Sequence, residues 1–359
     1  MRRDRFDLTG KTPYKTKEIK EGKIWQVTYD VEDKALTDTN AREEAKAFGM
    51  SLEDDAIQKK WLDTAALYGE EALAQAKKDL ERANYFYNKK DLTGEEIFES
   101  GPFSMNSFVV KLNSGSLLLY APVKIRDEVG FGDWIDSLGP VEWIVVASAY
   151  HTLSIKSVAQ RYPKAKIIGA PAAEAKLKFV NGLCRGKFDF ICTDKDDLKA
   201  VNEELKEEGI ILHCVDGDIA CHTVFAVAHN TGLTCDLMYG HHDGIGLCGL
   251  DKEEFEKYKP EHWGLRFFKY VLISKPNSPH GFLPNYRYHM MDPNAFGAMA
   301  YETPASDGSS CTTMAKSLRA ILKLEFDSVV GVHMERQSKE IFAKNIDSIW
   351  QWLDGNTLI

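Results

Sequence analysis

The chain has 359 residues, and its 54 Asp and Glu residues outnumber its 45 Lys and Arg residues, which gives a formal net charge of −9 at pH 7. Binding to nucleic acid or to an anionic membrane depends on Lys and Arg side chains, so this balance argues against both kinds of partner. With 44% hydrophobic and 28% charged residues, the composition is typical of a folded globular protein with two domains, or with one large domain and an extension.

Residues 1–100 are expected to form an arm and a long helix outside the main domain, which we place at 101–359. The arm is polar and contains one short predicted strand, Ile24–Tyr29. A capping box at Ser51 and Asp54 then starts a long amphipathic helix. Its apolar face predicts packing on the main domain, or on a second copy of the chain in a homodimer. The residues of this face are Trp61, Ala65, Tyr68, Ala72, Leu73, Ala76, Leu80 and Ala83.

The start of the sequence has basic residues but no apolar run behind them, so neither a signal peptide nor a membrane anchor is predicted there. The longest apolar stretches fall well short of the roughly 18 residues that a spanning helix requires. We therefore expect a cytoplasmic protein. Its seven cysteines form no CxxC pair and are expected to be reduced thiols.

Strands and helices alternate from Phe108 onward, which predicts an α/β main domain. Turn residues identify two β-hairpins. The first joins Phe108–Leu112 to Leu117–Tyr120, and the second joins Thr223–Ala228 to Leu233–Leu237 through a turn at Asn230-Thr231-Gly232. Helices are expected over Asp127–Leu138, Ile155–Tyr162, Lys195–Glu208, Thr312–Leu324 and Lys339–Leu353, and further strands over Trp143–Ala147, Lys166–Gly169, Ile210–Val215 and Ser328–Val332.

Three polar residues follow the ends of buried strands. His151 comes after the apolar run WIVVASAY, His333 follows SVVGV, and Asp236 ends the strand LTCDL. In layered α/β proteins, groups beyond the strand ends meet in a common crevice, where ligands and metals bind. Each of the three could instead be an ordinary hydrogen-bonded residue at a strand end.

The second hairpin adds His222 to this group. Antiparallel pairing places His222 opposite about residue 238, and therefore close to Asp236. Neutral imidazole and carboxylate groups together suit Zn, Fe or Mn, and such a site can lower the pKa of a bound water. The sequence thus predicts a His/Asp site for one divalent ion.

Further candidates lie beyond Asp236. His241 and His242 are adjacent and point in different directions, so at most one of them is expected to face the site, and a polar turn is the alternative. Tyr288 belongs to the long aromatic segment KPNSPHGFLPNYRYHMMDPNAFG. Such segments form either a wall of a substrate site or a plain covering of the surface.

Other chemistries lack their motifs. No GxGxxG follows a predicted strand, and neither a P-loop nor a GxSxG nucleophile elbow is present. Cys221 and Cys235 flank the expected site, but a role as small apolar residues of the hairpin explains them better than a role as nucleophiles.

Four segments carry a family resemblance: VVKLNSGSLLLYAPV, SLGPVEWIVVASAYHTLSIKSVAQRYPKAKIIGAP, CHTVFAVAHNTGLTCDLMYG and FDSVVGVHMERQSKE. With these segments in this order, the chain from about Phe108 to Leu353 resembles the metallo-β-lactamase-like superfamily, and more closely a divergent family within it. The resemblance implies a four-layer αββα sandwich with its site at the edge of the two sheets. It covers about two thirds of the chain, and residues 1–100 have no counterpart in it.

The resemblance implies metal ligands from an HxHxDH motif, a later His, a bridging Asp and a final His. His151 retains one histidine of the first motif, and His222, Asp236 and His333 fit the three later ligands. Ala149, Leu153 and Ser154 stand where the other His and the DH pair of the motif would fall. Because this first motif is degenerate, one of the two usual metal sites lacks its ligands.

We therefore expect an enzyme that hydrolyses a small-molecule substrate with one divalent ion, Zn or else Fe or Mn, held by His151, His222, Asp236 and His333. His241, His242 or Tyr288 would assist proton transfer. Two alternatives stay open. The same pocket could serve a metal-free lyase, or another non-hydrolytic enzyme, with His and Tyr as acid–base groups. The fold could also serve a non-catalytic binding or assembly protein.

Overall fold

The computed structural model describes residues 4–5, 14–30, 70, 74, 77, 104–148, 151, 154–171, 173–174, 188–218, 222–237 and 309–346. The helix predicted from Ser51 lies outside this set except for Glu70, Ala74 and Lys77, which are helical and exposed. At helical spacing these three share one face, opposite the predicted apolar face.

The larger sheet has eight strands in sequence order, from β1 to β8. The first five strands pair antiparallel, whereas β5 to β8 pair parallel. Helices lie in the connections from β5 to β6 and from β6 to β7, in agreement with the long crossovers that parallel pairing needs. The strands are β1 (Asp4–Arg5), β2 (Tyr14–Lys20), β3 (Ile24–Asp30), β4 (Ser104–Lys111), β5 (Leu117–Tyr120), β6 (Val141–Val146), β7 (Lys166–Gly169) and β8 (Phe190–Ile191).

The expected arm is, over residues 14–30, part of this sheet. Strand β3 confirms the strand predicted at Ile24–Tyr29, and it pairs along its whole length with β4. Strand β2 has no counterpart in the sequence analysis, because Lys and Glu outnumber its apolar residues. The burial of its first residues nevertheless alternates, with Tyr14 and Thr16 buried and the residues after each of them partly exposed. The sheet therefore crosses the boundary that the sequence analysis places at residue 100.

The smaller sheet has the order β13-β12-β11-β10-β9. Only β11 and β12 pair parallel. Its strands are β9 (Ile210–Cys214), β10 (Val224–Ala228), β11 (Thr231–Thr234), β12 (Ser328–Gly331) and β13 (Met334–Ser338).

The hairpin between β10 and β11 turns one residue earlier than the sequence predicts. His229 and Asn230 form the turn, and both have positive φ angles, 47° and 63°. This combination is typical of a tight two-residue hairpin. Gly232 belongs instead to β11, where an added Cβ would lie 2.6 Å from Cζ of Phe225. The glycine is explained by this close packing rather than by a turn.

Two cores hold the layers together. Apolar side chains of both sheets, among them Phe108, Leu118, Val224 and Leu233, belong to one buried cluster. The opposite face of β10 carries Phe225. Its ring packs on the ring of Phe326 and on that of Phe342, which belongs to the helical residues 339–346. The smaller sheet is therefore buried on both faces.

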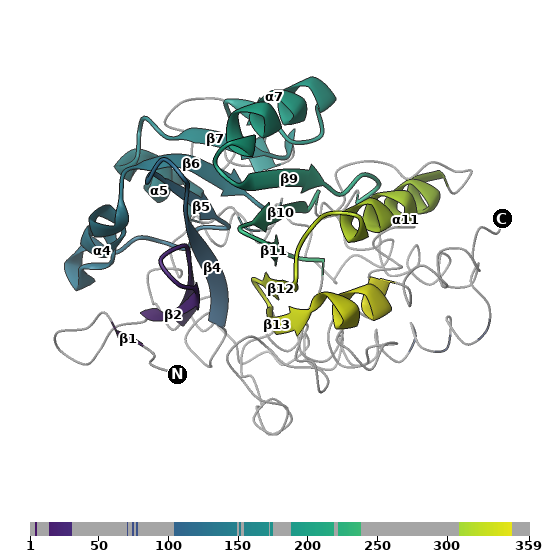
Figure 1. Cartoon of the computed structure of the whole chain (residues 1–359), viewed down its shortest axis with the longest axis horizontal. Coiled ribbons are helices and arrows are strands. Elements are labelled where there is room, and N and C mark those ends of the chain that lie inside the picture. Colours follow the sequence, from purple (N-terminus) through teal and green to yellow (C-terminus); the bar gives the residue numbers. More distant parts are fainter. Residues whose placement is uncertain are drawn as a thin grey trace.

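Helices cover the outer faces of the sheets. Phe131 of α4 (Phe131–Leu138) stacks on Tyr14 of β2 with ring centroids 4.1 Å apart. Figure 1 shows α4 and α5 (Ile155–Arg161) beside the larger sheet and α11 (Ser309–Leu322) on the other side of the molecule, beside the smaller sheet. The helix–sheet–sheet–helix arrangement confirms the predicted α/β fold class. A short 3-10 helix, η2 (Asp127–Val129), precedes α4.

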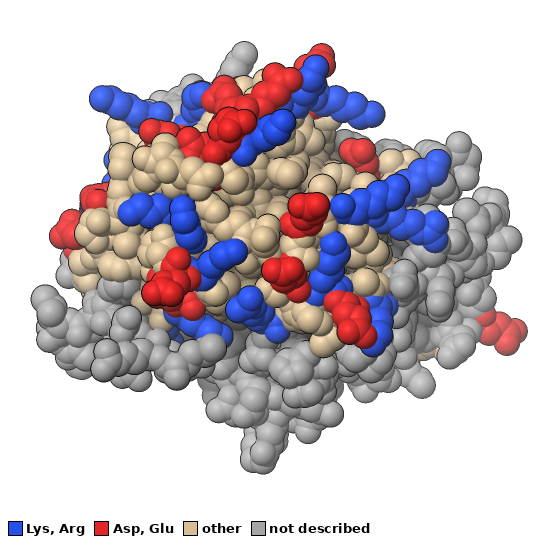
Figure 2. Space-filling view, viewed as in Figure 1, with Lys and Arg blue, Asp and Glu red and all other residues tan. Residues whose placement is uncertain are grey.

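Helix α7 (Lys195–Lys206) runs along the edges of both sheets, where it contacts β8 and β9. The carboxylate of Asp194 caps its first turn by accepting from the backbone N–H groups of Asp196 and Asp197. Lys, Arg, Asp and Glu side chains are interspersed over α7 and the rest of the face that Figure 2 shows. None of the described helices combines the length and hydrophobicity of a bilayer-spanning helix.

Candidate metal centre

Three of the predicted site residues lie just beyond strand ends, as expected. His151 follows β6, whereas Asp236 and His333 each lie two residues after the last residue of β11 and β12. Strands β11 and β12 are parallel and pair Thr234 with Gly331. The same register, continued by two residues, sets Asp236 beside His333. The parallel pairing therefore explains why these two side chains meet.

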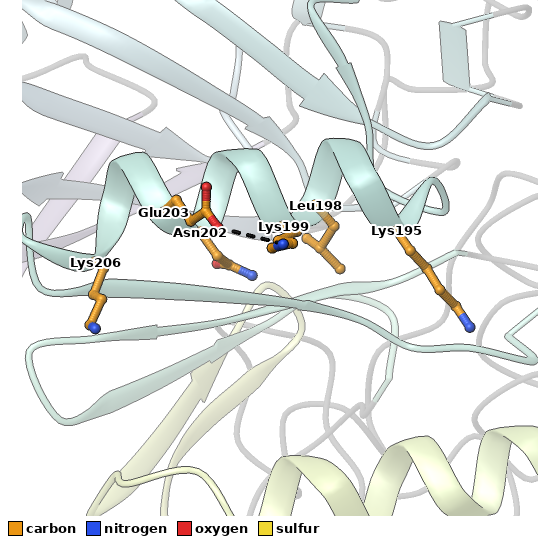
Figure 3. Close-up of a pocket in the computed structure, with 6 residues that line it drawn as sticks. All are labelled: Lys195, Leu198, Lys199, Asn202, Glu203 and Lys206. Atoms are coloured by element: carbon orange, nitrogen blue, oxygen red, sulfur yellow. Dashed lines mark ion pairs between the residues drawn. The ribbon is translucent and has the colours of Figure 1, made fainter.

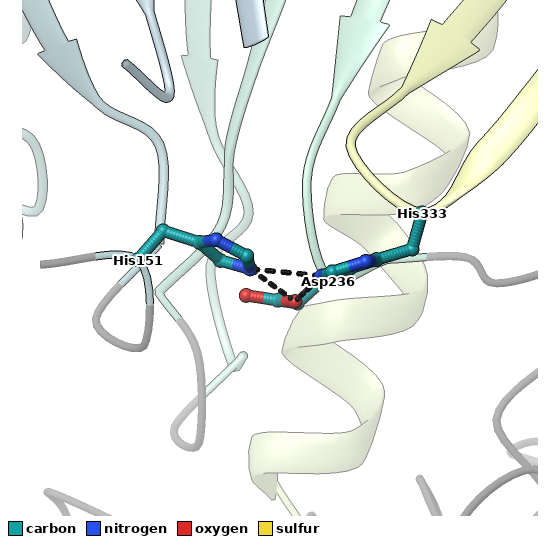
Figure 4. Close-up of side chains that lie close together, drawn as sticks. All are labelled: His151, Asp236 and His333. Atoms are coloured by element: carbon teal, nitrogen blue, oxygen red, sulfur yellow. Dashed lines mark hydrogen bonds and ion pairs between the residues drawn. The ribbon is translucent and has the colours of Figure 1, made fainter. Parts of the chain in front are cut away.

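The three side chains converge on one point (Figure 4). The Nε2 atom of His151 lies 3.0 Å from Oδ1 of Asp236 and 3.0 Å from Nε2 of His333. The third separation, from Nε2 of His333 to Oδ1 of Asp236, is 3.4 Å. His151 approaches from the larger sheet and the other two residues from the smaller one, so the site is assembled by the packing of the two sheets.

Burial makes the charges of this group interdependent. The side chain of Asp236 is 1% exposed, that of His333 4% and that of His151 11%. Burial alone would raise the pKa of the Asp236 carboxyl group. The charge and hydrogen bond of His151, together with the hydrogen bond of His333, outweigh burial and hold the pKa of Asp236 well below its usual value. A buried carboxylate of this kind requires such partners.

For His333, the effect of burial on the pKa prevails over the effect of its charged partner. Burial lowers the pKa of its imidazole, Asp236 opposes this shift, and the nearby His151 adds to it. The net pKa lies below the ordinary histidine value, so the ring is neutral near pH 7. A neutral imidazole is the form that binds a metal ion.

The donor set and its spacing fit one divalent cation. Two imidazole nitrogens and one carboxylate oxygen are the ligands of mononuclear sites for Zn or Fe. Ligand atoms that share one such ion at about 2.0–2.1 Å lie about 2.9 Å from one another at neighbouring octahedral positions and about 3.3–3.4 Å from one another in a tetrahedron. The three separations of 3.0, 3.0 and 3.4 Å agree with this spacing.

His222, the fourth predicted ligand, is not a member of this group. Its hairpin register, continued beyond β10, sets it opposite Leu237 rather than residue 238. The strand, however, begins only at Val224, and the backbone at His222 has a φ of 47°. The imidazole is buried, 5% exposed, outside the group of three.

A turn held by Asp218 fixes the backbone of His222. The carbonyl oxygen of Asp218 accepts from the His222 N–H, and its carboxylate Oδ2 accepts from the Thr223 N–H, at 2.8 and 2.9 Å. A non-glycine residue with positive φ is held in place only by such surroundings. Asp218 is itself fully buried.

The remaining candidates divide into described and undescribed residues. His241, His242 and Tyr288 lie outside the described residues, as do Ala149 and Leu153 of the degenerate motif. Ser154, from the same motif, precedes α5, and its carbonyl oxygen accepts from the Val158 N–H and the Ser157 hydroxyl. Ser154 therefore contributes to the start of a helix.

Two contacts join the sheets near the site. The N–H of Val224 donates to the carbonyl oxygen of Ala147, which follows β6, at 2.9 Å. The hydroxyl of Tyr120 donates to the carbonyl oxygen of Val224 at 2.5 Å. Burial, then Cys235 and Asp236, raise the pKa of this tyrosine well above its usual value. Sequence analysis does not identify Tyr120, because it looks like any buried strand residue.

Cys235 is unsuited to act as a nucleophile. Burial and the adjacent charge of Asp236 raise the pKa of its thiol well above the usual value. Nucleophilic cysteines need the thiolate form. The interpretation of Cys235 as a small buried residue agrees with this environment.

A shallow groove of about 440 Å³ runs along α7 and is separate from these residues (Figure 3). Its lining includes the ion pair of Lys199 with Glu203, at 3.9 Å. The other lining residues are Lys195, Leu198, Asn202 and Lys206. The groove contains none of the predicted site residues.

The chain matches no protein-family model, and no curated protein matches it. Among solved structures, a metallo-β-lactamase from Erythrobacter litoralis is 12% identical, with a TM-score of 0.47 over 96% of this chain and 99% of that one. A metallo-β-lactamase from Pseudomonas aeruginosa in its mono-zinc form is 10% identical, with a TM-score of 0.46 over 97% and 98%.

A flavodiiron protein variant from Thermotoga maritima is 12% identical, with a TM-score of 0.46 over 96% of this chain and 64% of that one. The layers and strand order described above, not these likenesses, carry the assignment of the fold. The chain is a two-sheet α/β protein, and the solved structures that it resembles include metallo-β-lactamases and flavodiiron proteins.

Proposed function

We propose that this chain is a metal-dependent hydrolase of a small-molecule substrate, with one divalent ion held by His151, Asp236 and His333. The observation that carries the proposal is the spacing of three ligand atoms from three strand ends, at 3.0, 3.0 and 3.4 Å. A divalent ion at such a site lowers the pKa of a coordinated water and polarises a substrate oxygen.

The protein side chains have separate tasks in this proposal. Asp236 supplies the negative charge and, through Oδ1, faces both histidines. His333 is neutral and almost fully buried, which suits a permanent ligand. His151 is the most exposed of the three, so we place the substrate on its side of the group.

Other residues could complete the site. His222 lies outside the group of three. His241 or His242 could replace it as a ligand, or assist proton transfer together with Tyr288. A group of three protein ligands favours a catalytic site over a structural one, since a catalytic metal site keeps an open position for water and substrate.

The test is elemental analysis of the full chain, purified without added metal and without a His tag. Asp236→Ala and His333→Ala are compared with His213→Ala, which removes a half-buried histidine that bonds Ser317 instead. We expect about one equivalent of Zn, Fe or Mn in the parent and in His213→Ala, and little in the other two. Circular dichroism confirms that each variant is folded.

A folded parent that holds no metal, and takes up none when titrated with Zn, Fe and Mn, would contradict the proposal. A metal-free lyase or a binding protein would then be the better interpretation of the same group of residues. Metal that stays bound after both substitutions would contradict the assigned ligands instead.

A further inference from the structure

We infer that Asn106, a residue of the larger sheet, is a positioning residue that sets the place of His333. The inference rests on the proposed function in one respect, because its consequence is read as metal affinity. Asn106 lies in the middle of the part of β4 that pairs with β3, opposite Thr28. It is not one of the three residues of the metal group and carries no charge.

Asn106 makes two hydrogen bonds to the residues directly before His333. Its backbone N–H donates to the carbonyl oxygen of Val332 at 2.9 Å. Its side-chain Nδ2 donates to the carbonyl oxygen of Gly331 at 3.0 Å. These bonds cross from the larger to the smaller sheet, so they fix the turn that carries His333 relative to the sheet that carries His151.

The other end of the Asn106 amide is also held. Its Oδ1 atom accepts from Nε2 of Gln26 at 2.9 Å and from the hydroxyl of Thr28 at 2.8 Å. The Gln26 amide also donates to the Thr28 hydroxyl, at 3.2 Å, which leaves that hydroxyl to donate to Asn106. With both donors at Oδ1, the NH2 group can face only Gly331. The network therefore fixes the orientation of the amide.

Burial raises the importance of this arrangement. Asn106 is 1% exposed, and an amide in such a place costs free energy unless its hydrogen bonds are satisfied. The turn that it holds is tight, because Gly331 pairs with Met334 across only two residues. A Cβ at Gly331 would lie 2.3 Å from Cγ of Met334. A change in how the Gly331 carbonyl is held therefore moves the His333 backbone, and a displacement of about 1 Å weakens a metal site.

The experiment measures zinc affinity by competition with a chromophoric chelator. Asn106→Ala is compared with Asn202→Ala, a matched control, since Asn202 bonds the backbone of Leu212 through both ends of its amide, at 2.9 and 2.7 Å. We expect Asn106→Ala to weaken zinc binding about tenfold, the scale of an outer-shell partner. Asn202→Ala should remain within about twofold of the parent, well inside that scale.

Asn106→Asp keeps the oxygen that accepts from Gln26 and Thr28, but it loses the donor to Gly331. If positioning depends on that donor, this variant is as weak as Asn106→Ala. Zinc binding at the parent level in either Asn106 variant would overturn the inference.

A double-mutant cycle separates positioning from a general loss of structure. In the His333→Ala background, Asn106→Ala should change the residual zinc affinity no further, because the residue on which it acts is gone. A further tenfold loss in that background would show that Asn106 acts by another route.

A readout without metal distinguishes this inference from the proposed function. In ¹⁵N-histidine NMR spectra of the metal-free protein, Asn106→Ala should shift the ring signals of His333 and leave those of His213 in place. This result, in a parent that binds no metal, would end the metal proposal and keep the positioning role. Unchanged His333 signals would end the positioning role, even in a parent that binds zinc.

Discussion

The Nε2 atoms of His151 and His333 lie 3.0 Å apart, although the first residue follows a strand of the larger sheet and the second a strand of the smaller sheet. Only one of two facing ring nitrogens can carry a proton at this distance. The pair therefore needs a shared proton or a shared cation, and the Asp236 carboxylate beside it favours either one. A shared cation satisfies all three groups at once.

Asp236→Asn tests the charge of this group without changing its size. The amide still fills the space, but it removes the negative charge that faces both histidines. We expect zinc affinity to fall by more than about 100-fold, the upper end of the effect of outer-shell partners. Chelator competition measures the change.

The matched control is Asp197→Asn, which removes a carboxylate that accepts from the Ile191 backbone N–H. Its zinc affinity should equal that of the parent. Equal losses in the two variants would mean that the site depends on overall stability rather than on the charge of Asp236.

The convergence of His151, Asp236 and His333 was predictable because strand ends are visible in a sequence. The apolar runs before His151 and His333 mark buried strands, and the ends of these strands meet where the two sheets pack together. The fold class was predictable for the same reason. Strand β2 was not, since a strand half covered by solvent and rich in Lys carries little apolar signal.

His222 shows where such reasoning ends. The sequence analysis places His222 close to Asp236 by extending the antiparallel pairing of the hairpin past the ends of its strands. Strand β10 begins only at Val224, and His222 lies before it, where its bond to Asp218 holds the backbone with a positive φ. Asn106 shows the same limit, since its side-chain bond to Gly331, before His333, joins residues 225 positions apart. No local pattern reports such a contact.

Gly232→Ala tests the corrected position of the hairpin turn. Because Gly232 lies in β11 against Phe225, an added methyl group overpacks the core, and we expect a loss of about 1–3 kcal/mol in the free energy of unfolding. Urea unfolding measures it. Phe225→Leu should restore part of the loss in the double variant. No restoration would point to a backbone requirement for glycine.

Arg161→Met tests a cluster of charges that joins α5 to η2 and α4. The guanidinium contacts Asp127 and pairs with Asp136 at 2.6 Å and with Asp133 at 3.5 Å. These carboxylates are largely exposed, so we expect a loss of only about 1 kcal/mol, smaller in 1 M salt. Lys166→Met, which removes one exposed pair with Glu204 and a contact of the ammonium group with the Trp143 ring at 5.0 Å, is the control and should lose less.

His213 should make the protein less stable in acid. Burial is the largest cause that lowers the pKa of its imidazole, against the opposing effects of Asp216 and of Ser317. Below the unfolded pKa of about 6.5, the unfolded chain therefore binds more protons than the folded protein. The free energy of unfolding is unaffected by His213 above that pH and decreases below it. In His213→Gln, which can still bond the Ser317 hydroxyl, the decrease in the free energy of unfolding from pH 7 to pH 5 should be shallower. Urea unfolding at each pH measures it, and an equally steep decrease in this variant would assign the acid sensitivity to other groups, such as the buried His333.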